Sequence, residues 1–106
     1  MVERNLNFEL ALSDLKLSFT VAGQTFRCLP ECPPLAWARI ATAQGNDYLP
    51  AALFFIEAVL VEEDVPRWRE LLASRQIVIP VDTVMTIAAD LLREYAGRPT
   101  NGSAGS

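Results

Sequence analysis

The chain has 106 residues, of which 51% are hydrophobic, and its 9 basic and 13 acidic residues give a net charge of −4. This length suits one domain with its own apolar core. The arginines are scattered among carboxylates with no basic run, which excludes nucleic acid and anionic membranes as main partners. We expect a single domain over residues 1–97 and a disordered tail over residues 98–106, where small polar residues dominate.

The N-terminal residues lack the apolar segment that follows a basic start in secretory signals. The longest apolar stretch, residues 51–61, contains Glu57 and is shorter than the ~20 residues that a membrane-spanning helix needs. We therefore expect a soluble cytoplasmic protein, in which the two cysteines, Cys28 and Cys32, are reduced.

Apolar and polar residues alternate with period two on both sides of Gly23, which is typical of half-buried strands. A two-residue turn at this glycine pairs Phe19 with Phe26 and Leu17 with Cys28, so that all four side chains share one face. Glycine also supplies the positive φ that such a turn needs. The sequence therefore predicts an antiparallel hairpin.

An earlier segment alternates in the same way, through Leu6, Phe8, Leu10 and Leu12. It fits a third strand, although residues 9–12 also suit a short helix. Pro30, Pro33 and Pro34 then end the sheet region, because proline has no N–H to give to a strand ladder.

Helical patterns fill the rest of the chain. The first runs over residues 35–44 and ends before Gly45, and the second runs from about residue 46 to Glu62. Asp64 is a candidate cap for a third helix, whose apolar residues include Trp68, Leu71 and Leu72. Asp82 is a candidate cap for the last helix, which carries a stripe of Val84, Ile87, Ala88, Leu91 and Tyr95. We predict an α+β fold that is mostly helical: an N-terminal hairpin, with or without a third strand, packed on about four helices.

The second helix is apolar around nearly its whole circumference, with Glu57 as its one interior charge. Such a helix is either wrapped by its own neighbours or covered by a partner, and its sequence leaves both interpretations open. We predict that the helix has more apolar surface than one small domain can cover. The candidate contact residues are Phe54, Phe55, Val61, Trp68 and Leu72.

Residue types needed for most enzyme chemistry are missing. The chain has no histidine, so histidine-based triads and histidine-containing zinc sites are impossible, and it has no glycine-rich phosphate loop. Cys28 and Cys32 supply two thiols where a zinc site needs four ligands, and their spacing differs from a redox Cys-x-x-Cys. We expect no catalytic residues, no cofactor and no metal. A thiol or metal enzyme built on these two cysteines stays as a rival interpretation.

Most of the chain, from about residue 15 to residue 100, resembles a known family. The likeness lies in the predicted hairpin and in three later segments: residues 54–60 (FFIEAVL), residues 62–72 (EEDVPRWRELL) and residues 91–100 (LLREYAGRPT). These segments resemble the tail assembly chaperones of long-tailed bacteriophages. The resemblance implies a helical chaperone that coats the apolar tape measure protein before the tail tube forms around it.

Such chaperones are often made in two lengths, the longer by a ribosomal frameshift, and this chain resembles the short form. The resemblance implies that the partners are the tape measure protein and the frameshift-extended form of the chain, and it brings no catalytic residues. The host bacterial cytoplasm is then the expected location. The main rival is a self-associating structural or adaptor module that has no client, and a homo-oligomer fits either interpretation.

Overall fold

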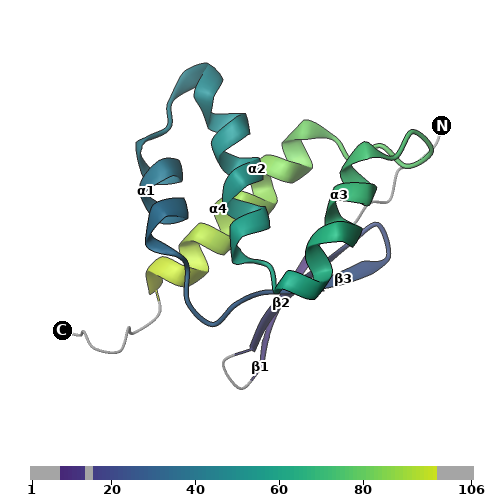
Figure 1. The fold of residues 1–106 in the computed structure, drawn as a ribbon, viewed down its shortest axis with the longest axis horizontal. Helices are drawn as coiled ribbons and strands as arrows, with labels where there is room; N and C mark the ends of the chain where they lie inside the picture. The colour runs from purple at the N-terminus through teal and green to yellow at the C-terminus, as the bar shows by residue number, and fades with distance from the viewer. Residues whose placement is uncertain (1–7, 14–15, 98–106) are drawn as a thin grey trace.

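The computed structural model describes residues 8–13 and 16–97. The fold is α+β, with an N-terminal sheet followed by helices (Figure 1). The elements are β1 (Glu9–Ser13), β2 (Lys16–Val21), β3 (Gln24–Arg27), α1 (Pro34–Thr42), the 3-10 turn η1 (Gly45–Asp47), α2 (Tyr48–Val59), the 3-10 turn η2 (Glu62–Asp64), α3 (Val65–Ala73) and α4 (Val81–Gly97). The predicted tail over residues 98–106 lies outside the described residues.

The predicted hairpin is confirmed in its register. Phe19 pairs with Phe26, and the Cys28 N–H donates to the Leu17 carbonyl at 2.8 Å. The turn places Ala22 at φ 54° and Gly23 at φ 78°. Two consecutive positive φ values are typical of a type I′ turn, whose twist matches that of the flanking strands.

The third strand also forms. β1 pairs antiparallel with β2, with Leu10 opposite Phe19 and Glu9 opposite Thr20, so the sheet order is β1-β2-β3. The predicted start of this segment at Leu6 lies outside the described residues. Phe8 lies just before the strand, and its ring centroid is 6.0 Å from that of Phe19. The contact extends the apolar face of the sheet.

α3 covers the apolar face of the sheet through one aromatic cluster. The Trp68 ring lies 5.6 Å from the Phe19 ring and 5.3 Å from the Phe26 ring, at interplanar angles of 85° and 78°. All three side chains are fully buried. The buried Trp68 Nε1–H has no hydrogen-bond acceptor among the described residues, and nearly perpendicular rings are the geometry in which an N–H meets an aromatic face. The cluster therefore joins the sheet to the helices.

α2 lies between α1 and α4 (Figure 1). Its buried residues are Ala51, Ala52, Phe55, Ile56 and Val59. The Phe55 ring meets the Tyr95 ring of α4 at a centroid distance of 6.4 Å. The stripe predicted on α4 is confirmed, because Val84, Ile87, Ala88, Leu91 and Tyr95 are all buried. The prediction that α2 has more apolar surface than its neighbours can cover is therefore wrong for these five residues, while Phe54 stays 36% exposed.

α2 ends at Val59, three residues before the predicted end at Glu62. Leu60 leaves the helix and forms an isolated antiparallel bridge with Cys28. The Leu29 N–H donates to the Val59 carbonyl at 2.6 Å, and the Val61 N–H donates to the Arg27 carbonyl at 3.0 Å. These hydrogen bonds pair residues 59–61 with the outer edge of β3 and the two residues after it. The chain makes this pairing in place of one more turn of α2.

Two predicted helix caps act differently. Asp64 precedes α3 as expected, but its carboxylate makes no capping hydrogen bond and reaches across to β3 instead. Asp82 lies inside the first turn of α4, one residue after the helix begins at Val81. A carboxylate in the first turn still favours the helix through its dipole.

Candidate protein-binding surfaces

Two of the five predicted contact residues belong to the core. Phe55 and Trp68 are fully buried, so neither presents a side chain to a partner, and the prediction that they form a contact surface is wrong. Periodicity places both on apolar helix faces but does not say which face the rest of the fold covers. Val61 is half-buried, with its backbone hydrogen-bonded to β3. Phe54 and Leu72 stay open to solvent, at 36% and 37% exposure.

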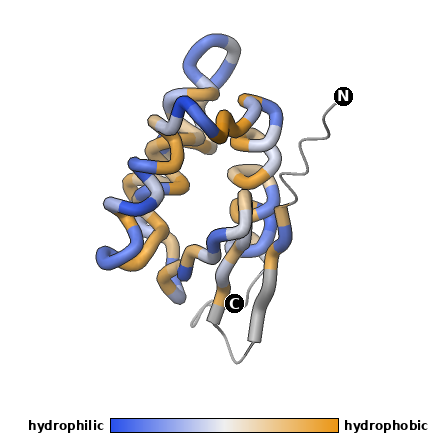
Figure 2. The backbone as a smooth tube through the Cα atoms, turned by 90° about the vertical axis from the view of Figure 1, so that its right-hand side faces the viewer, coloured by the Kyte–Doolittle hydropathy of each residue, from blue (hydrophilic) through white to orange (hydrophobic). Residues whose placement is uncertain are grey.

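Four larger exposures escaped the sequence prediction. Leu35 is 73% exposed on α1, and Ile77, Val78 and Val81 are 42%, 62% and 52% exposed around the connection between α3 and α4. Apolar and polar residues alternate irregularly along the helices (Figure 2), so the hydropathy of a residue does not show by itself which apolar side chains are exposed. A sequence signal did exist, since residues 77–79 form an apolar run between two helices that nothing else explained.

The first exposed group lies on α1 and α2 and consists of Leu35, Arg39 and Phe54. We call it the hairpin surface after this pair of consecutive helices; it is distinct from the β2–β3 hairpin. Leu35 and Arg39 are one helical turn apart on α1, and both are exposed. The Arg39 guanidinium lies 4.7 Å from the centre of the Phe54 ring on α2, so the two helices meet here through a cation–π contact.

A hollow of about 370 Å³ adjoins the hairpin surface, lined by Arg39, Thr42, Ala43, Asp47, Pro50 and Ala51. Arg39 belongs both to this hollow and to the contact with Phe54. The region therefore combines exposed apolar side chains, a depression between two helices and two opposite charges, Arg39 and Asp47. Such a surface suits an apolar helix face whose polar residues complement both charges.

The second exposed group surrounds the connection from α3 to α4, and we call Leu72, Ile77, Val78 and Val81 the connector surface. Ser74 shapes the connection: its Oγ accepts hydrogen bonds from the backbone N–H groups of Gln76 at 3.2 Å and Ile77 at 3.0 Å. Ile79 is buried in the core between exposed neighbours. The exposed side chains therefore sit on an anchored segment.

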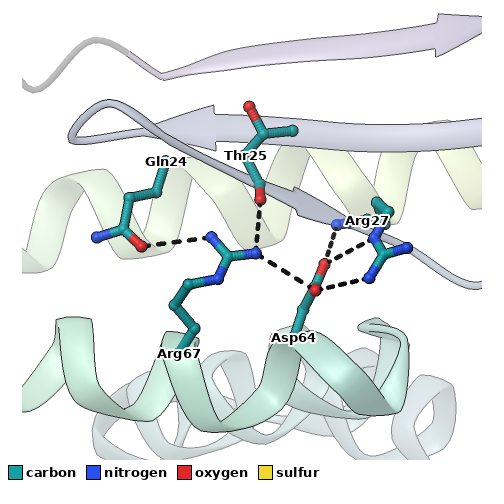
Figure 3. A network of polar contacts seen from close by, with 5 residues as sticks. All are labelled: Gln24, Thr25, Arg27, Asp64 and Arg67. Carbon is teal, nitrogen blue, oxygen red and sulfur yellow. Dashed lines mark hydrogen bonds and ion pairs between the residues drawn. The ribbon is translucent and has the colours of Figure 1, made fainter.

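The buried Asp64 carboxylate is the centre of a polar network that joins β3 to the start of α3 (Figure 3). It accepts hydrogen bonds from the Arg27 backbone N–H at 2.8 Å, Arg27 Nε at 3.2 Å and Arg27 Nη2 at 2.9 Å. Arg67 Nη2 lies 3.3 Å from Asp64 Oδ1. Hydrogen bonds from the Arg27 side chain, followed by its backbone N–H and the two positive charges, lower the pKa of Asp64 to about 2 against the opposing effect of burial.

Arg67 extends this network to the hairpin turn. It donates to Gln24 Oε1 at 3.3 Å and to the Thr25 carbonyl at 3.0 Å, while its guanidinium lies 4.5 Å from the centre of the Phe26 ring. All of these contacts join α3 or the turn before it to β3 (Figure 3). The network therefore serves the fold, and both oxygens of the Asp64 carboxylate are occupied within the chain.

Within residues 8–13 and 16–97, four arginines pair with carboxylates: Arg27 and Arg67 with Asp64, Arg69 with Glu57, and Arg93 with Asp90. Arg39 and Arg75 form no ion pair in that part of the chain. Both are exposed. Arg39 belongs to the hairpin surface, and Arg75 lies in the connection that carries the connector surface. Each exposed apolar surface thus has an arginine that forms no ion pair with a carboxylate of the described residues.

The cysteines are unlike a reactive pair. Cys28 is buried and Cys32 is half-buried, and no disulfide joins the two. Burial raises the pKa of the Cys32 thiol to about 11, which keeps it protonated at neutral pH. Among the described residues no group of three or more Cys, Asp or Glu side chains is arranged to hold a metal ion. No helix in that same part of the chain is long and apolar enough to cross a membrane.

Comparisons with protein-family models, curated proteins and solved structures found no match to this chain.

Proposed function

We propose that this chain is a tail assembly chaperone of a long-tailed bacteriophage, in its short form, and that it binds the tape measure protein before the tail tube polymerises. It acts by covering an apolar helical client in the host cytoplasm and carries out no catalysis. The resemblance of residues 54–60, 62–72 and 91–100 to that family supports the proposal.

One structural observation carries the proposal: the domain buries a complete core and still leaves apolar side chains open on the hairpin surface. Leu35 is 73% exposed although the neighbouring Ala36 is buried. Phe54 is 36% exposed, although the next two residues of the helix, Phe55 and Ile56, are fully buried. Because covering an exposed leucine or phenylalanine contributes about 1–2 kcal/mol, this surface favours an apolar partner.

The hollow beside Arg39 gives that partner a shape and a charge. A client helix can lay an apolar stripe against Leu35 and Phe54, and one of its carboxylates can pair with the Arg39 guanidinium. This replaces the larger contact surface predicted from sequence, since Phe55 and Trp68 are inside the core. The contact residues of the proposal are Leu35, Arg39 and Phe54.

The test is co-expression with the tape measure protein, with the soluble fraction of the client as the readout. Leu35→Asp and Phe54→Asp place a carboxylate on the hairpin surface, and we expect each to reduce the soluble client at least about fivefold. Thr86→Asp is the matched control, because Thr86 is exposed and belongs to α4, whereas the hairpin surface lies on α1 and α2. Circular dichroism checks that all three variants keep their helices.

Unchanged client solubility in both hairpin variants, with folding preserved, would contradict the proposed binding surface. If the wild-type chain gives no gain in soluble client over an empty vector, the proposed function itself is wrong. Light scattering on the isolated chain tests the rival structural module: a stable oligomer that Leu35→Asp dissolves would show that a second copy covers the hairpin surface.

A further inference from the structure

The three-stranded sheet has two outer edges, and the chain covers the edge formed by β3. There the Arg27 N–H donates to Asp64 Oδ2 at 2.8 Å, and the Arg27 carbonyl accepts from the Val61 N–H at 3.0 Å. The Thr25 carbonyl accepts from Arg67 Nη2 at 3.0 Å. β1 forms the other edge, and in the part of the chain that the structure describes it pairs with β2 alone. In Figure 1 β1 and β2 extend beyond α3, so this edge lies open.

The hydrogen-bond pattern of the sheet identifies which backbone groups of β1 point outward. The Leu17 carbonyl of β2 accepts a hydrogen bond at 2.8 Å from the residue that follows β3, so Leu17 turns its backbone to β3. Neighbouring residues of an antiparallel strand turn to opposite sides, so Ser18 turns to β1, where it pairs with Ala11. The same alternation along β1 turns the N–H and C=O groups of Leu10 and Leu12 away from β2.

β1 has few of the features that stop an edge strand from pairing with another chain. Its five residues, ELALS, include no proline and no lysine, and each pairs with one residue of β2, so the strand has no bulge. Proline, lysine and bulges are common means of blocking an open edge. The one charged residue of the strand, Glu9, is its first residue. β1 is therefore a template for a further strand.

The apolar layer of the sheet is also incomplete at this edge. Phe19 and Phe26 are fully buried, whereas Leu10, directly opposite Phe19, is half-buried, as is Phe8. Residues directly opposite each other in adjacent strands share one face of a sheet. A further strand with apolar residues on that face would cover Leu10 and Phe8. The edge therefore favours a strand with the alternation of β1 itself.

We propose that the partner of this edge is β1 of a second copy of the chain, paired antiparallel about a two-fold axis at Ala11, so that two three-stranded sheets join into one. In this register Leu10 of each copy exchanges both of its outward backbone hydrogen bonds with Leu12 of the other. Every residue of β1 then has a partner, and the apolar faces of the two sheets become continuous.

The charges favour this register over its neighbours. It places Glu9 opposite Ser13 of the second copy, and Ser13 pairs with Lys16 on β2. Glu9 and this lysine then lie in one row of the joined sheet, two strand spacings or about 10 Å apart. An axis at Glu9 would instead place two carboxylates opposite each other, which is destabilising. An axis at Leu10 would place Glu9 opposite Ala11, with no cation in its row.

Sedimentation velocity of the isolated chain at rising concentration tests the dimer. A contact between two five-residue strands is small beside the roughly 1,200–2,000 Å² of a stable interface, so we expect a dimer that forms as concentration rises. Hydrogen exchange locates the contact. The outward N–H groups of Leu10 and Leu12 should exchange at least about tenfold more slowly at the concentrations where the dimer forms.

Opposite charges placed at the two-fold axis test the register. Ala11 of one copy meets Ala11 of the other there, and residue 11 lies on the same face of the strand as the exposed Glu9. We expect Ala11→Lys and Ala11→Glu each to raise the Kd of the dimer at least about tenfold, and a mixture of the two variants to restore it. Thr25→Lys is the matched control, because Thr25 is exposed and belongs to β3, and its dimer should match the wild type. Circular dichroism checks that each variant is folded.

A chain that stays monomeric at its highest soluble concentration overturns the inference. So does a dimer that persists in Ala11→Lys, or a mixture of the two folded variants that does not associate. A dimer that Leu35→Asp dissolves overturns it as well, because the second copy would then cover the hairpin surface.

The dimer and the proposed function fail separately. A chain that dimerises through β1 but does not keep the tape measure protein soluble disproves the function and leaves the dimer standing. A monomeric chain that keeps the client soluble disproves the dimer alone.

Discussion

Two arginine–phenylalanine pairs in this molecule have nearly the same geometry and opposite surroundings. Arg67 lies 4.5 Å from the centre of the Phe26 ring, and Arg39 lies 4.7 Å from the centre of the Phe54 ring. Phe26 is fully buried and Arg67 also pairs with the buried Asp64, whereas Phe54 is 36% exposed and Arg39 has no ion pair within the described residues. The first pair belongs to a junction that the chain completes by itself.

The difference separates a contact that the fold completes by itself from a contact that a partner protein can still complete. At the β3–α3 junction the fold supplies the ring, the cation and the carboxylate, and all three are paired with one another within the chain. On the hairpin surface the fold supplies the ring and the cation, and the Asp47 carboxylate lines the adjoining hollow without forming an ion pair with Arg39. A partner that brings a carboxylate and an apolar side chain would complete the same arrangement there.

Removing Trp68, the aromatic centre of the β3–α3 junction, should have the largest effect on stability. Trp68→Ala takes a fully buried ring from between Phe19 and Phe26. We expect a loss of about 3–5 kcal/mol in the free energy of unfolding, measured by urea denaturation with circular dichroism. Phe54→Ala is the matched aromatic variant of the open surface, and its loss should be less than half as large. Equal losses would contradict the distinction between the two regions.

Two consecutive leucines of α3 sharpen the comparison within one helix. Leu71 is 4% exposed and Leu72 is 37% exposed on the connector surface. We expect Leu71→Ala to lower the free energy of unfolding by about 2–4 kcal/mol and Leu72→Ala by about 1 kcal/mol or less. The same denaturation experiment measures both, and helix propensity cancels between them because the substitution is identical. A larger loss for Leu72→Ala would show that the connector surface is part of the core.

Acid should destabilise the β3–α3 junction, because it protonates the Asp64 carboxylate. The folded protein holds the pKa of this carboxyl at about 2, below its ordinary value of 3.8. A lowered carboxyl pKa stabilises the fold above the ordinary value, and that stabilisation is lost as the pH falls from about 4 to about 2. We expect Asp64→Asn to lose about 2 kcal/mol at neutral pH and to show a smaller further loss between pH 4 and pH 2 than the wild type. Thermal unfolding at several pH values measures both, and parallel curves would contradict the assignment to Asp64.

The sequence by itself determined the elements whose pattern is local. Alternation on both sides of Gly23 located the hairpin and its register, and the stripe on α4 identified its five buried residues. These predictions succeed because side-chain direction repeats every two residues in a strand and every 3.6 residues in a helix. The acidic and proline residues before Trp68 marked the start of α3, although the role of Asp64 differed from the predicted cap.

Only the tertiary structure decided which apolar residues stay open. Phe54 and Phe55 are neighbours in one apolar helix, yet Phe55 meets Tyr95 of α4 and Phe54 meets only the exposed Arg39 of α1 among the ring and cation contacts of the described chain. Likewise, the pairing of Leu60 with Cys28 ended α2 earlier than its own sequence indicated. Burial depends on which distant segment arrives at each face, and a single sequence carries that information in no local pattern.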